Sequence, residues 1–213
     1  MNDYYFILED GEQTGPFSLA ELIEKEPDIH TRVLSPIENT WMDACDVPEL
    51  YDYFLSQGLY FPTESNLASF WIRLGAFAID IIIVSIISDF IIVFLSVKGV
   101  MPDIRSLATM QSISKMPVND LLLMQGVFYL TIVIYNSICE ASQMKGSVGK
   151  IACRLAVVDA DGQGISFPNA LARSLGKVVS LYFMGVGFLS IFWSEHRQAL
   201  HDYVAKTYVV KKS

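Results

Sequence analysis

The chain has 213 residues, of which 52% are hydrophobic and 18% are charged, and its mean hydropathy is +0.38. This composition is more apolar than that of an ordinary soluble protein and predicts several membrane segments plus one small polar domain. Charge is divided unevenly: residues 1–69 contain 14 acidic and two basic residues, whereas residues 70–213 contain nine acidic and 13 basic residues. The acidic first part excludes nucleic acid as its partner.

Three scattered cysteines, Cys45, Cys139 and Cys153, form no CxxC pattern, so neither a zinc site nor a disulfide framework is predicted. They fit a reducing cytoplasm. The first five residues are polar and acidic and do not resemble a signal peptide, so we expect the first apolar segment to deliver the chain to its membrane. We predict no metal site and no cofactor.

The first 52 residues have the pattern of a small soluble α+β domain. Residues 4–8 form a strand candidate, Asp10-Gly11 is a turn signal, and Ser18-x-x-Glu21 is a capping box that predicts a short helix. A second strand is expected over residues 31–34. A helical turn is expected over residues 47–50, and residues 53–67 form a polar linker to the membrane domain over residues 68–213.

An aromatic pattern in this domain resembles the GYF-like module found at the ends of bacterial membrane proteins. The order is Tyr4-Tyr5, then Gly11-Glu-Gln-Thr-Gly-Pro-Phe17, Trp41 and Val47-Pro-Glu-Leu50, and it covers residues 3–52. The Gly-Tyr-Phe triplet itself is absent. The resemblance implies binding of a proline-rich or other protein partner through Tyr4, Tyr5, Phe17 and Trp41. A core role for these aromatic residues is the alternative, because small domains bury their large apolar side chains.

Residues 70–96 form an apolar segment long enough to span a bilayer, since about 20 helical residues cross the hydrocarbon core. Arg73 and Asp80 are seven positions apart and therefore lie on one helix face, roughly 10 Å apart along the axis. Asp89 is expected on the opposite face near the far interface. Asp80 lies near mid-depth, where a carboxylate requires a partner or a hydrated pathway.

Residues 121–138 form the second predicted span, after a short polar loop over residues 98–117. Glu140 follows near its end, where it is either interfacial or a partner of Arg73. The segment from Lys145 to Lys150 contains two glycines, but its spacing does not match a phosphate-binding loop. Farther on, residues 151–158 form a strand candidate. Residues 165–167 could pair back on it, and so could residues 207–210 if the chain returns to the same side of the membrane.

The third apolar stretch, residues 178–193, has about 16 residues and contains Gly185-Val-Gly187, so it either crosses the membrane or turns back as a re-entrant segment. Turning back would place nine bases of residues 142–213 on one side and three bases of residues 98–117 on the other. The positive-inside tendency favours this arrangement, with both the amino-terminal domain and the carboxyl tail in the cytoplasm.

The order of charged residues resembles the RDD family of bacterial membrane proteins over residues 66–212. The matching positions are Arg73, Asp80, Ser147-Val-Gly-Lys150 and His201-Asp202. His196 and His201 are five apart and diverge around a helix, so they predict no metal site. The resemblance implies a multi-pass protein of the bacterial inner membrane with a transport activity, which is cation/proton exchange in some members.

Two functions remain open from the sequence. In the first, Arg73, Asp80, Asp202, Glu140 and Lys150 form a charge network that couples protons to monovalent-cation transport; the absence of a repeat then implies a homo-oligomer. In the second, the same charges lock the helices of a membrane adaptor that recruits a partner through its amino-terminal domain. No nucleophile, base and orienting group occur together in the pattern expected of an enzyme.

Overall fold

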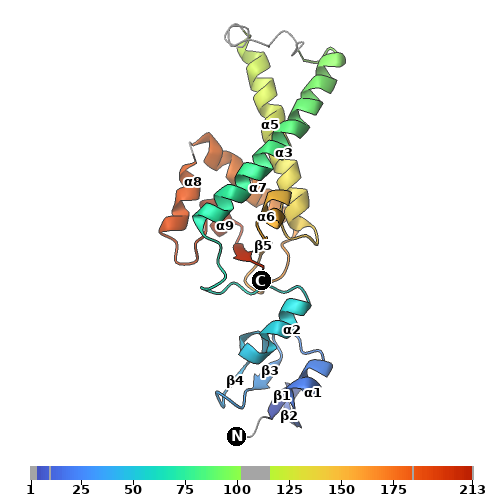
Figure 1. Cartoon of the computed structure of the whole chain (residues 1–213), viewed down its shortest axis with the longest axis vertical. Helices are drawn as coiled ribbons and strands as arrows, with labels where there is room; N and C mark the ends of the chain where they lie inside the picture. Colours follow the sequence, from blue (N-terminus) through green and yellow to red (C-terminus); the bar gives the residue numbers. More distant parts are fainter. Residues whose placement is uncertain (1–3, 10, 102–115, 184, 213) are drawn as a thin grey trace. The chain divides into compact units, whose positions relative to one another are not determined.

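The computed structural model describes residues 4–9, 11–101, 116–183 and 185–212. It divides into two compact units (Figure 1). The first unit comprises Met1–Phe61 with Asp161–Gln163, and the second comprises Pro62–Ala160 with Gly164–Ser213.

An antiparallel four-stranded sheet in the order β2-β1-β3-β4 forms the first unit. Its strands are β1 (Tyr5–Glu9), β2 (Glu12–Phe17), β3 (Arg32–Leu34) and β4 (Trp41–Asp43). Helix α1 (Leu19–Glu24) begins with the predicted capping box, because the Ser18 hydroxyl accepts from the Glu21 amide and the Glu21 carboxylate accepts from the Ser18 amide. The 3₁₀ turns η1 (Ala44–Asp46) and η2 (Pro48–Leu50) lead into α2 (Tyr51–Ser56).

One face of this sheet forms the hydrophobic core of the first unit. Tyr5 and Ile7 alternate along β1, so both point to the buried side with Val33 of β3. Phe54 of α2 is also buried there and meets Phe61 edge-on, with ring centroids 5.5 Å apart. The compact unit therefore extends through residues 53–61, which were expected to belong to the linker, because Phe54 and Phe61 complete its core.

Two long helices, α3 (Phe70–Val97) and α5 (Val118–Ala141), are long and apolar enough to cross a membrane, as predicted. Their large side chains, such as Ile82, Phe90 and Leu122, are exposed, as expected of surfaces that face lipid. Figure 1 shows the two helices crossing, with the remaining elements of the second unit gathered around the first half of α3.

Beyond α5, residues 148–152 form the short helix α6 (Val148–Ala152), and β5 comprises Leu155–Val158. The strand expected over residues 151–158 is therefore wrong in its first half, because the α6 backbone instead contacts α3. β5 pairs antiparallel with β6 (Tyr208–Lys211), from Leu155 opposite Lys211 to Val158 opposite Tyr208. The predicted pairing of these two distant segments is confirmed.

Helix α7 (Phe167–Tyr182) has Pro168 in its first turn, where the missing amide proton costs no helical hydrogen bond. It is followed by α8 (Val186–Leu189), η4 (Ser190–Phe192) and α9 (Leu200–Val204). The helical segments 167–182 and 186–192 meet at an angle of 112°, so residues 178–193 do not form one straight span. Close packing at Gly176 holds α7 on α9, since a Cβ there would lie 2.9 Å from the Cβ of His201.

Candidate functional site

Six buried charged side chains converge where the first half of α3 meets α5, α6, α7 and α9. The side chains are at most 11% exposed. We call this group the charge cluster; its members are Arg73, Glu140, Lys150, Arg173, Lys177 and Asp202. Burial removes these charges from water at a high energetic cost, so their arrangement decides whether the second unit is stable.

Asp202 occupies one half of the charge cluster. Its Oδ1 accepts from Nε and Nη2 of Arg173 at 2.7 and 2.5 Å, and its Oδ2 accepts from Nη1 of Arg73 at 2.6 Å. The Ala199 amide donates to Oδ2 at 3.2 Å. Burial alone would raise the pKa of Asp202, but the guanidinium groups of Arg173 and Arg73 outweigh burial and hold that pKa far below its usual range. Asp202 is therefore a permanent anion.

Glu140 occupies the other half. Its Oε1 accepts from Lys177 at 2.5 Å and from Lys150, and its Oε2 accepts from Nη1 of Arg173 at 2.9 Å. Lys177 also donates to Oδ1 of Asn136 at 2.9 Å. Of the two alternatives that the sequence left open, pairing with Arg73 is not observed: the basic partners of Glu140 are Lys150, Arg173 and Lys177. Arg173 joins both carboxylates and thereby ties α7 to α5 and α9.

Asp80 lies outside this set of ion pairs. Its carboxylate accepts from the hydroxyls of Tyr135 and Ser147 at 2.9 and 2.5 Å and from the amide of Gly149 at 2.8 Å. Among the described residues, no basic side chain lies within ion-pair distance of it. Gly149 permits this contact, because a Cβ there would collide with the Ala76 carbonyl and lie 2.9 Å from Cγ of Asp80. Asp80 thus fastens α6 to α3 through neutral donors.

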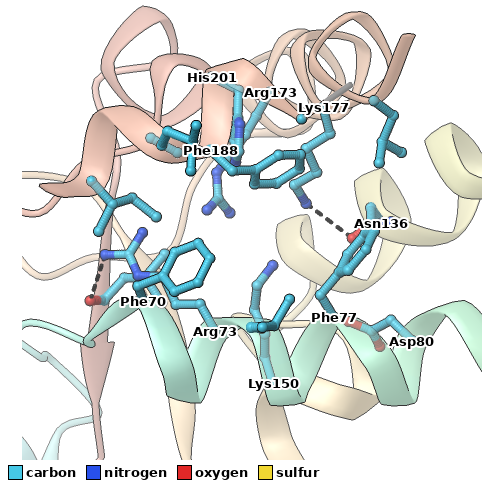
Figure 2. Close-up of a pocket in the computed structure, with 17 residues that line it drawn as sticks. Phe70, Arg73, Phe77, Asp80, Asn136, Lys150, Arg173, Lys177, Phe188 and His201 are labelled. Atoms are coloured by element: carbon cyan, nitrogen blue, oxygen red, sulfur yellow. Dashed lines mark hydrogen bonds between the residues drawn. The ribbon is translucent and has the colours of Figure 1, made fainter. Parts of the chain in front are cut away.

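A cavity of about 270 Å³ opens beside the charge cluster (Figure 2). Four basic side chains and one acidic side chain line it: Arg73, Lys150, Arg173, Lys177 and Asp80. Aromatic and aliphatic side chains of α3, α7 and α8 form the rest of the wall, among them Phe70, Phe77, Phe188 and Leu189. Glu140 and Asp202 do not line it; they are fully buried behind the bases. The surface that the cavity presents is therefore apolar and cationic.

His201 of α9 also lines the cavity and is 5% exposed. Its Nε2 lies 3.3 Å from Oδ1 of Asp202. Burial lowers the pKa of His201 to about 3, outweighing the attraction of Asp202, so the ring is neutral at pH 7. The carboxylate favours the proton on Nε2, which leaves Nδ1 as an acceptor. This buried Nδ1 has no hydrogen-bond partner within the described part of the chain.

Sequence reasoning missed Arg173 and Lys177. They are four positions apart and therefore share one face of α7, between the small residues Ala170, Ser174 and Ser180, which are also buried. The sequence signal that could have identified them is the presence of two basic residues, four positions apart, on a helix face of small residues. Asp89, expected on the face opposite Asp80, is exposed on α3.

In the first unit, the four aromatic residues predicted to bind peptide differ in burial and in position. Tyr5 is 5% exposed and belongs to the core, whereas Tyr4 is exposed. Phe17 packs against the core beneath the Lys25 ammonium, 4.8 Å from the ring centroid, and Trp41 is half-buried on β4. Strand register instead defines an apolar row on the sheet face opposite the core, with Phe6 opposite Leu34 and Leu34 opposite Trp41.

Comparison with known proteins identifies both parts of the chain. The model of the RDD family matches residues 67–206, and the model of GYF domain 2 matches residues 4–50. Uncharacterized protein YxaI of Bacillus subtilis (strain 168) is 30% identical over 148 residues, which cover 68% of this chain and 97% of YxaI. Uncharacterized protein YckC of the same organism is 30% identical over 149 residues, covering 67% of this chain and 83% of YckC. No solved structure matches.

Proposed function

Since the chain belongs to the RDD family and carries a GYF_2 domain at its amino terminus, we propose that it is a bacterial membrane adaptor. Its RDD domain is an anchor whose helices are locked by buried charge, and its GYF_2 domain recruits a protein partner. One observation carries this proposal: each carboxylate of the charge cluster is already paired with two or three cations of the same chain. A transported cation would have to displace one of these buried partners.

The apolar lining of the groove between α3 and α5, on the side of Asp80 away from the charge cluster, supports the same function. There the groove between α3 and α5 is lined by Ile87, Ile91, Leu95, Val127, Leu130 and Ile134, with Thr131 and Tyr135 as its polar members. Thr131 donates its hydroxyl to the Val127 carbonyl of its own helix. An ion crossing this groove would lose its hydration without gaining ligands, which is energetically costly. The described residues of one chain therefore favour anchoring over conduction.

The distribution of basic residues predicts how the two spans are oriented in the membrane. The start of α3 and the end of α5 share one end of a two-span hairpin, and residues 142–213 beyond it contain nine bases, against three in residues 98–117. The positive-inside rule then assigns that end to the cytoplasm. The GYF_2 domain precedes α3 and therefore lies in the cytoplasm as well.

The apolar row of the first unit, defined above by Phe6, Leu34 and Trp41 and flanked by exposed Leu8, is the proposed docking surface. Residues 1–61 contain 13 acidic and two basic residues, which favours a partner carrying positive charge. Polyproline segments dock on aromatic surfaces because they are extended and rigid before binding. We therefore expect a proline-rich segment flanked by lysine or arginine.

Full-length protein in nanodiscs, titrated with fluorescent proline-rich peptides with and without basic flanks, tests this assignment. Trp41→Ala should weaken binding at least tenfold, because aromatic anchors dominate such interfaces. Ile37→Ala removes an exposed aliphatic side chain outside the strands and serves as the matched control. Equal binding by the wild type and Trp41→Ala, or binding equal to that of a proline-free peptide, would reject the surface.

Proton-coupled monovalent-cation transport is the second candidate, and one observation favours it. Asp80 lines the cavity and its carboxylate is held by neutral donors alone among the described residues, so, unlike Glu140 and Asp202, it is not already paired with a cation. A homo-oligomer would have to supply the polar path that one chain lacks. Infrared difference spectra of wild type and Asp80→Asn across pH 5–9 test this. A carboxyl band that titrates and disappears in Asp80→Asn would favour transport; its absence favours the adaptor.

A further inference from the structure

The charges around the cavity do not cancel when Lys177 is protonated. The charge cluster with Asp80 contains four basic and three acidic side chains, and His201 is neutral. Burial lowers the pKa of Lys177 to about 7, so the protonated form that supplies the excess charge is present at neutral pH and below. Two of the three carboxylates lie behind the bases, so the cavity itself is lined by four cations and one anion. An added monoanion would neutralise the group. Low-dielectric surroundings strengthen that attraction relative to water.

Lys150 has donors to spare for such an anion. Its ammonium donates to Glu140, which leaves two N–H groups without a partner in the described chain, whereas Lys177 already donates to both Glu140 and Asn136. Figure 2 shows the Lys150 side chain rising from one side of the cavity toward Lys177 and Arg173 on the other side. An anion between them would reach ammonium groups from both sides.

The aromatic residues of the second unit indicate the depth of this cavity in the membrane. Trp71 of α3, Trp193 after η4 and Tyr203 of α9 are 72%, 80% and 72% exposed. Phe70 and Phe192 bring the start of α3 against η4, with ring centroids 4.8 Å apart. Exposed Trp and Tyr at the end of a span are typical of the headgroup level. Phe70, the first residue of α3, lines the cavity, so part of the cavity lies at the level where lipid phosphates are concentrated.

The size and the apolar wall of the cavity limit which ligands it can bind. Sites for whole drug-sized ligands occupy about 300–1,000 Å³, so a cavity of about 270 Å³ admits a headgroup but not acyl chains. Leu74 and Leu189 line the cavity and are each more than 40% exposed, which provides an apolar surface along which chains can leave toward the bilayer. The vacant acceptor Nδ1 of His201 calls for a hydroxyl donor on the ligand.

We propose that this cavity binds one anionic phospholipid whose headgroup carries a hydroxyl, with its phosphate between Lys150, Lys177 and Arg73. The phosphate neutralises the excess positive charge, the headgroup hydroxyl donates to His201, and the acyl chains pass over Leu74 and Leu189. Charge and apolarity together select this ligand: a free phosphate compound leaves the apolar wall uncovered, and a zwitterionic lipid leaves the cations uncompensated.

Lipid retention tests the proposal. Full-length protein is reconstituted in equal amounts of phosphatidylglycerol and phosphatidylcholine with identical chains, extracted in mild detergent and analysed by native mass spectrometry. Wild type should retain phosphatidylglycerol at least tenfold over phosphatidylcholine. Lys150→Gln keeps a hydrogen bond to Glu140 but removes the charge, and should reduce that ratio at least fivefold, whereas Lys150→Arg should preserve it. Lys98→Gln, the same change at an exposed position at the far end of α3, is the control.

A second measurement on the wild type remains decisive even if Lys150→Gln does not fold. Phosphatidylglycerol with a photoreactive group near its glycerol should crosslink to residues 70–77 and to Leu181, Phe188 and Leu189, which line the cavity. Crosslinks spread evenly over α3 and α5, or equal retention of the two lipids, would overturn the proposal. Displacement of the lipid by glycerol phosphate at equal concentration would show that the cavity takes a free phosphate compound and would also overturn the lipid assignment.

Discussion

Replacing Glu140 by glutamine should be the most damaging single change that preserves side-chain shape. The carboxylate is fully buried and accepts hydrogen bonds from Lys150, Arg173 and Lys177. The amide would remove the anion and leave three desolvated cations facing one another. Breaking a buried ion pair from one side costs about 3–5 kcal/mol, which for a domain of this size lowers the unfolding temperature by on the order of 10 °C.

Thermal unfolding of the detergent-solubilised protein, followed by size-exclusion chromatography after heating, measures this loss. Asp89→Asn removes the same charge from an exposed position of α3 and should change stability by less than about 0.5 kcal/mol. Adding Lys150→Gln to Glu140→Gln removes one stranded cation, so the double variant should be more stable than the sum of the single losses predicts. A Glu140→Gln variant within about 1 kcal/mol of wild type would refute the locking role of the charge cluster.

Further predictions concern other parts of the chain. Gly149→Ala should lower the free energy of unfolding by about 1–3 kcal/mol, because the new Cβ separates α6 from Asp80; equal melting temperatures would contradict this packing. The pKa of His201 is lowered from 6.5 to about 3, so the unfolded chain binds the extra proton and stability is lost as pH falls below 6.5, by up to about 1.4 kcal/mol per pH unit. His201→Gln should flatten this acid slope in melting curves measured between pH 7 and 4. A fragment of residues 1–61 should show dispersed amide signals, whereas a fragment of residues 1–52, which lacks part of the core, should not.

The two long helices were predictable because length and hydropathy alone select a span, and neither depends on distant contacts. The capping box of α1 was predictable for a similar reason, since its two residues satisfy each other locally. The pairing of β5 with β6 followed from two short apolar runs, although α6 shortened the first of them.

The partners of Glu140 were not predictable from local pattern. Arg173 and Lys177 lie more than 30 positions after Glu140 in the chain. They belong to a helix whose second half is apolar, so the sequence pattern does not single out the face that they share. The end of the first unit was missed for another reason. Gly58 and Pro62 are typical of a linker. However, Phe54, which precedes Gly58, and Phe61, which lies between Gly58 and Pro62, pack into the core. In both places, long-range packing outweighs the local sequence signal.

Ion flux through purified protein tests the central claim, that the RDD domain is a locked anchor, most directly. Full-length protein in liposomes is exposed to a pH gradient with Na⁺, K⁺ or Li⁺ outside, and internal pH is followed with a fluorescent dye. A locked anchor should give proton movement equal to that of protein-free liposomes, for both wild type and Asp80→Asn. Cation-dependent proton movement by the wild type that Asp80→Asn abolishes, without loss of folded protein, would contradict it.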